Sequence, residues 1–122
     1  MAYRAVCIAI TCLFLLADGA AVRELVIIEK PQPAQHVEGT VFDPSGAPVP
    51  DMTVTDRSEQ WISVLRSTTT DSKGHFRFSP QPGKTVYYLR FDNPLFNPLE
   101  LKLKLDNKSA QRAITVKVPI GG

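Results

Sequence analysis

Cysteine is almost absent from this chain of 122 residues: there are two, Cys7 and Cys12, and none follows. The chain beyond residue 12 therefore has no internal disulfide framework and no thiolate ligand for a zinc site. A sequence of about 100 residues can still bury enough apolar surface to fold on its core alone. We therefore expect one domain that is held together by packing.

A large charge of either sign is also missing. The formal net charge is +2, and the sequence contains no run of basic residues of the kind that binds along a phosphate backbone. Nucleic acid is therefore not an expected partner.

One long apolar run is present, and it lies at the start. Residues 5–17, "AVCIAITCLFLLA", follow a single positive charge and are ended by Asp18, Gly19 and Ala20. This order predicts a secretory signal peptide over residues 1–20, and hence a secreted or periplasmic protein. The run is shorter than the roughly 20 residues of a membrane span, so no span is expected in the mature chain. Whether the peptide is cleaved or stays as an anchor is left open.

Residues 21–35, "AVRELVIIEKPQPAQ", combine an apolar stretch with two prolines. Pro31 and Pro33 favour an extended connector, whereas the stretch from Leu25 to Ile28 could add a strand to the edge of a sheet. Both alternatives stand: an extended linker or an extra edge strand.

From residue 36 to residue 122 the pattern is one of alternation with no sustained helical period. Apolar and polar residues alternate in seven short segments, residues 36–43, 52–56, 61–70, 75–79, 85–92, 99–106 and 113–120. Alternation marks half-buried strands, and the segments recur about every ten residues. The pattern predicts a seven-stranded antiparallel β-sandwich. Its expected core is Val37, Val41, Met52, Val54, Phe76, Phe78, Tyr87, Leu89, Phe91, Leu101, Leu103, Val116 and Val118.

The turns between these segments carry a recognisable order of residues. The stretch "VEGTVFDPSGAPVPDMTV" and the later "TTTDSKGHFRFSPQPGKTVYYLRFDNPLF" contain the turn residues Asp43, Gly46, Pro48, Asp71, Gly74, Pro82 and Gly83. Glycine supplies positive φ in such turns, and aspartate accepts hydrogen bonds from nearby backbone N–H groups. Together the two stretches resemble the carboxypeptidase regulatory-like domain, a sandwich of the transthyretin (prealbumin) type.

The resemblance implies an accessory module and not an enzyme. Domains of this kind accompany carboxypeptidases, adhesion proteins and outer-membrane receptors, and the wider fold group includes carbohydrate-binding domains. A hydrolase of purine breakdown shares the transthyretin fold, and His36 lies at its catalytic-type position. That enzyme ends in a Tyr-Arg-Gly-Ser tail, however, whereas this chain ends "VKVPIGG", so the hydrolase is a remote alternative.

The residues themselves offer little chemistry. His36 and His75 are the only histidines, and two ligands do not make a structural zinc site. The loop at Asp71 lacks the alternating oxygen ligands of a calcium loop. We therefore expect no metal, no cofactor and no catalytic residue.

Two aromatic residues are candidates for ligand binding. Tyr88 lies on the polar side of its strand and should be at the surface. Trp61 begins the segment 61–70, and the face on which it lies is open: its ring either lies at the surface or caps the sandwich core. Exposed rings can stack on sugars, which makes a polysaccharide one possible ligand. The other expected partner is a protein, because edge strands with unpaired N–H and C=O groups can accept another strand. The strand with Lys102 and Lys104 would discourage self-association if it were an edge.

Overall fold

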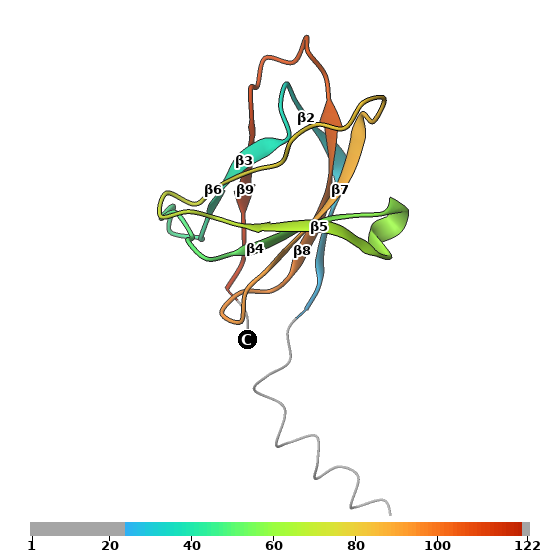
Figure 1. The fold of residues 1–122 in the computed structure, drawn as a ribbon. Coiled ribbons are helices and arrows are strands. Elements are labelled where there is room, and N and C mark those ends of the chain that lie inside the picture. Colours follow the sequence, from blue (N-terminus) through green and yellow to red (C-terminus); the bar gives the residue numbers. More distant parts are fainter. Residues whose placement is uncertain (1–23, 121–122) are drawn as a thin grey trace, which may run out of the picture.

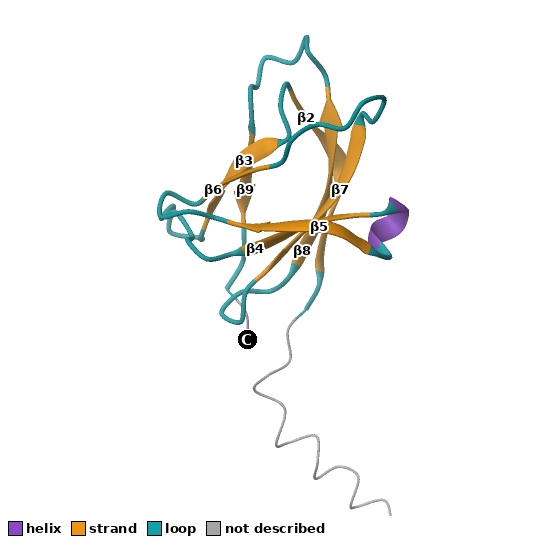
Figure 2. Ribbon diagram, in the orientation of Figure 1, coloured by secondary structure: helices purple, strands orange, loops and turns teal. Residues whose placement is uncertain are grey.

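The computed structural model describes residues 24–120, which form two β-sheets packed face to face (Figures 1 and 2). The predicted signal peptide, residues 1–20, lies outside the described residues. The strands are β2 (Val26–Ala34), β3 (Glu38–Phe42), β4 (Thr53–Arg57), β5 (Val64–Thr69), β6 (His75–Arg77), β7 (Val86–Asp92), β8 (Leu99–Leu105) and β9 (Ile114–Lys117), with a short 3-10 helix, η2 (Glu59–Trp61), between β4 and β5.

All seven segments predicted from alternation contain a strand, and the predicted β-sandwich is confirmed. Within the described residues there is one further strand, β2, so the sandwich has eight. The larger sheet has the order β2-β8-β7-β4-β5, and the smaller has the order β6-β3-β9. The sheets are not wholly antiparallel, since β2 runs parallel to β8 and β3 runs parallel to β9. Alternation of side chains reports which face is buried but not the direction of a neighbouring strand, so the sequence could not reveal these two pairs.

β2 occupies the segment for which a linker and an edge strand were both possible. Its pairing with β8 is interrupted between Ile28 and Gln32, and it resumes at Gln32, which pairs with Leu103. Proline has no N–H to donate to a ladder, so it is tolerated at an edge strand or an irregularity in pairing. β2 meets both conditions, because it is the first strand of its sheet and its register shifts beside Pro31.

The core lies between the sheets. All thirteen residues predicted for it are buried, and Ala34, Val49, Leu99 and Ile114 join them. The rings of Phe76 and Phe91 meet edge to face across the sandwich, with centroids 5.3 Å apart. The strand β8 lies between β2 and β7 and is not an edge, so Lys102 and Lys104 project from the middle of a sheet face.

The predicted turn residues act as backbone acceptors and as points of positive φ. Asp43 Oδ1 accepts hydrogen bonds from the Ser45 hydroxyl and from two backbone N–H groups. Asp71 Oδ1 accepts the N–H groups of His75 and Lys73. The three signature glycines, Gly46, Gly74 and Gly83, have φ of 90°, 75° and 77°.

These hydrogen bonds lower the pKa of both aspartates. The main causes are the Ser45 hydroxyl for Asp43 and the His75 N–H for Asp71. A lowered folded-state pKa means that each carboxylate stabilises the fold above its unfolded pKa, and that this contribution is lost as the pH falls through the folded one.

Candidate functional site

Trp61 belongs to the turn between β4 and β5 and not to a strand. The turn is closed by hydrogen bonds between Ser58 and Ser63, and the Trp61 N–H donates to the Ser58 carbonyl at 2.8 Å. Gln60 and Trp61 have φ of 60° and 56°, which reverses the chain before β5 begins at Val64. The prediction that Trp61 starts a strand is therefore wrong, because consecutive positive φ angles are incompatible with extended backbone.

The turn brings Trp61 against Tyr88, 27 residues further along the chain. The two ring centroids are 5.0 Å apart and the ring planes meet at 88°. The Trp61 indole N–H donates to the Leu89 carbonyl at 3.1 Å, which fixes the ring against β7. Both side chains are half-buried. Trp61 thus lies over the outer face of the larger sheet and does not cap the core between the sheets.

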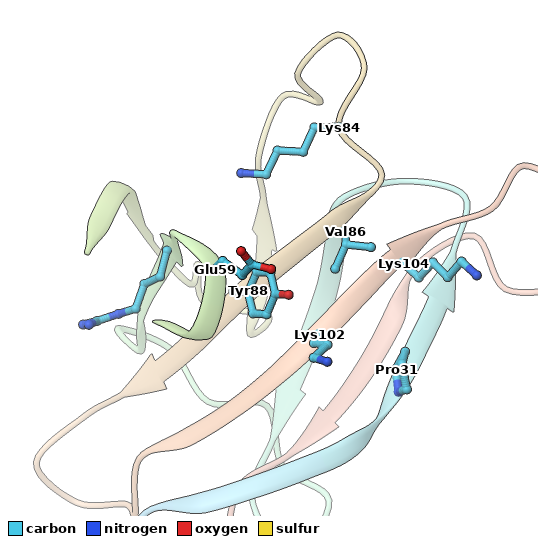
Figure 3. Close-up of a pocket in the computed structure, with 8 residues that line it drawn as sticks. Pro31, Glu59, Lys84, Val86, Tyr88, Lys102 and Lys104 are labelled. Carbon is cyan, nitrogen blue, oxygen red and sulfur yellow. The ribbon is translucent and has the colours of Figure 1, made fainter. Parts of the chain in front are cut away.

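A shallow groove of about 550 Å³ lies beside Tyr88 on the outer face (Figure 3). Its lining residues come from five parts of the chain: Pro31, Arg57, Glu59, Lys84, Val86, Tyr88, Lys102 and Lys104. An adjoining hollow of about 280 Å³ is lined by Ile27, Ile28, Glu29, Trp61 and Lys102. Lys102 lines both, so the groove and the hollow meet beside Tyr88. We call the two together the outer-face groove.

Three residues form a row across the middle of this groove. Arg57 of β4 is the register partner of Tyr88 of β7, and Tyr88 is the register partner of Lys102 of β8. The Lys102 ammonium lies 5.7 Å from the centre of the Tyr88 ring. Side chains opposite one another on neighbouring strands share a face, so a cation flanks the tyrosine on either side.

The cations of the groove differ in how they are neutralised. The Lys84 ammonium lies 3.7 Å from the Asp56 carboxylate and 4.9 Å from the centre of the Tyr87 ring. Arg57 donates to the Thr55 hydroxyl and weakly to the Trp61 carbonyl. Within residues 24–120, neither Arg57, Lys102 nor Lys104 takes part in an ion pair.

Asp56 is a buried charge that the alternation pattern alone did not single out. It is fully buried, and its Oδ2 accepts a hydrogen bond of 2.7 Å from Arg66 Nε. The Arg66 guanidinium also lies over the Phe78 ring, 4.8 Å from its centre. Asp56 is two residues after the core residue Val54 in the same strand, so alternation places both on the buried face. A carboxylate at a core-facing position was the sequence signal that could have identified it. Because its two partners are cations, its role is to anchor Arg66 on β5 and Lys84 at the end of the groove.

The histidines do not converge. His75 pairs in register with Thr40, and its Nε2 is 3.6 Å from Glu38 Oε1, whereas His36 precedes β3 and is exposed. Within residues 24–120 no three side chains of His, Cys, Asp or Glu gather in a metal-binding group. Nor does this part of the chain contain a helix with the length and apolar character needed to cross a membrane.

The sequence was compared with models of known protein families. Residues 36–119 match the family model of the carboxypeptidase regulatory-like domain. A search of the curated proteins finds no match. The matched residues run from before β3 to beyond β9, so they include every strand except β2.

Proposed function

Because the chain belongs to the carboxypeptidase regulatory-like domain family, whose β-sandwich is a regulatory-type module and not itself catalytic, we propose that it is a secreted, non-enzymatic accessory protein. Secretion rests on the apolar run at residues 5–17. The protein acts by binding, and its binding site is the outer-face groove.

The observation that carries this proposal is the meeting of Trp61 and Tyr88 beside an open groove. An aromatic ring that serves only stability belongs between the sheets, where Tyr87, Phe76 and Phe91 are buried. The position of the Trp61 ring on the outer face instead depends on a turn with positive φ at two non-glycine residues, Gln60 and Trp61. Such backbone carries strain, and strained residues cluster at functional sites.

The groove also supplies the contacts that binding sites use. Tyr and Trp are amphipathic rings that bury area against a ligand while keeping a polar atom for hydrogen bonding. The side chains of Arg57 and Lys102 lie on either side of the Tyr88 ring and can orient a polar ligand. The residues that line the groove offer no nucleophile paired with a base, which fits binding without catalysis.

The test uses Trp61 as a reporter, since it is the single tryptophan of the chain. We expect its fluorescence to change when the protein is titrated with a panel of soluble neutral and acidic polysaccharides that contains a ligand. Replacing Tyr88 by alanine should weaken that binding about tenfold, because one ring contact is lost. The matched control is Phe42→Ala, which removes a half-buried ring from β3 in the other sheet. An equal loss in both variants, or no response to any polysaccharide, would contradict the proposal.

A second candidate function is protein interaction at the edge strand β5. Three large apolar side chains lie exposed within four residues there: Ile62 (75%), Val64 (52%) and Leu65 (52%). The single charged residue of β5, Arg66, is turned inward onto Asp56. Natural edge strands usually carry an outward charge or a proline that blocks pairing. β5 has neither, so it is suited to pair with the strand of another protein, and the partner we propose is a second copy of this chain.

A further inference from the structure

We infer that the outer-face groove takes an acidic polysaccharide, a chain of sugar rings that carries carboxylate or sulfate groups. This inference rests on the proposed function of the groove and adds the chemical class of its ligand. Three features support it: the charges of the groove, the register of its residues and the paired backbone of its floor.

The charge of the groove is positive where a ligand would lie. Arg57, Lys102 and Lys104 line it without an ion-pair partner among residues 24–120, whereas Lys84 is paired with Asp56. One carboxylate, Glu59, is among the residues that line the main groove, and Glu29 lines the adjoining hollow. A hollow with cations in excess concentrates anions and holds them by charge-assisted hydrogen bonds. A neutral glucan would leave these cations without a counter-charge.

The spacing of the cations suits an anion on each side of a stacked ring. Arg57, Tyr88 and Lys102 are register partners on three neighbouring strands, so the backbone positions that carry the two cations are about 10 Å apart, with the tyrosine between them. Lys104 is two residues beyond Lys102 on the same face of β8, about 7 Å away. A sugar ring that lies against Tyr88 would therefore place acidic groups of itself and of its neighbours within reach of Arg57, Lys102 and Lys104.

The floor of the groove favours a sugar over an acidic peptide. β4 and β7 each have a hydrogen-bonded strand on both sides, and so does β8 except where its pairing with β2 is interrupted beside Lys102. Most backbone N–H and C=O groups of the floor are therefore engaged in the sheet. A peptide laid across them would find few backbone partners for its own amides, and buried amides without partners are costly. A sugar needs only ring faces for its C–H groups and cations for its acidic groups, and both are present.

The experiment measures the affinity of the purified protein for four soluble polymers by Trp61 fluorescence and calorimetry. They are polygalacturonate, a sulfated glycosaminoglycan, amylose as the neutral sugar and polyglutamate as the acidic peptide. We expect binding to one or both acidic polysaccharides, with an affinity that falls as salt is added. Carboxylate and sulfate are distinguished by which of the two polymers binds more tightly.

Two variants separate the groove from general surface charge. Lys102→Gln/Lys104→Gln should weaken binding about tenfold through the loss of two partly exposed pairings. Lys73→Gln/Lys117→Gln removes the same charge from a turn and from the other sheet, and it should bind like the wild type.

The outcomes are distinct. Binding of amylose that depends on Tyr88 but not on the two lysines, or a preference for polyglutamate over every sugar, would overturn the inference and leave a binding site in the groove. An equal effect of both lysine pairs would also overturn it. Absence of binding to all four polymers would overturn the inference and the proposed polysaccharide site together.

Discussion

Position 74, in the turn between β5 and β6, requires glycine because of its close neighbours as well as its positive φ angle. A Cβ atom at this position would lie 2.5 Å from the Val41 carbonyl oxygen and 3.1 Å from the Val49 N. Both neighbours are backbone atoms, and the Gly74 carbonyl accepts a hydrogen bond from the Val41 N–H. Gly83 has nearly the same positive φ, but a Cβ atom there would meet nothing within 4 Å. Substitution of Gly83 thus measures the cost of positive φ alone, whereas substitution of Gly74 adds the cost of steric contact with the backbone.

We expect Gly83→Ala to lower the free energy of unfolding by about 1 kcal/mol, the cost of an L-residue at positive φ. Gly74→Ala should lower it by roughly 1–3 kcal/mol more, because the backbone of β3 must also move. The measurement is chemical denaturation of both variants beside the wild type. Equal losses would mean that the turn opens without disturbing β3, contrary to the contacts described.

Residue identity predicted the turns and the core but not the position of Trp61. Asp43 and Asp71 accept hydrogen bonds in their turns, and Gly46 and Gly74 have positive φ, as their sequence context indicated. These features are local, so a few neighbouring residues determine them. Positive φ at Gln60 and Trp61 has no such signal, because neither residue type favours it. Hydrogen bonds between Ser58 and Ser63 close the turn, and no sequence pattern predicts them.

At the scale of elements, alternation located the strands well because each sheet has one buried and one exposed face. β8 is the clearest case: Leu99, Leu101 and Leu103 are buried, while Lys104 is exposed. What alternation could not supply was strand order and direction. The neighbours of β8 are the earlier strands β2 and β7, and the parallel pairing with β2 joins residues about 70 positions apart.

The edge strand β5 has an exposed apolar surface that suits self-association. We expect the protein to form a dimer in a concentration-dependent manner through antiparallel pairing of two β5 strands, which would cover Val64 and Leu65. Leu65→Lys should shift it to a monomer, because a buried lysine would face the partner strand. Leu95→Lys is the matched control, since Leu95 is equally apolar and 71% exposed but lies between β7 and β8. Sedimentation equilibrium measures the mass, and a wild-type monomer at every concentration would contradict the dimer.

At the scale of the whole molecule, the groove exists only because distant segments meet. Its lining residues lie on β2, β4, η2, β7 and β8 and in the approach to β7. The sequence singled out Trp61 and Tyr88 as aromatic candidates, and the structure brings them together. It could not single out Arg57 or Lys102 as their neighbours, since that requires the order β8-β7-β4. Family membership describes the sandwich, whereas the groove depends on the side chains that this chain places on its outer face.

The most direct test of the binding site is to map backbone and indole N–H signals by NMR while polygalacturonate is added. We predict shifts at the Trp61 indole N–H and at the amides of Arg57, Tyr88 and Lys102, with the strands β6, β3 and β9 unaffected. The indole signal is unambiguous because the chain has one tryptophan. Shifts confined to β5 or to the smaller sheet, with the Trp61 indole unchanged at saturation, would contradict a binding site in the outer-face groove.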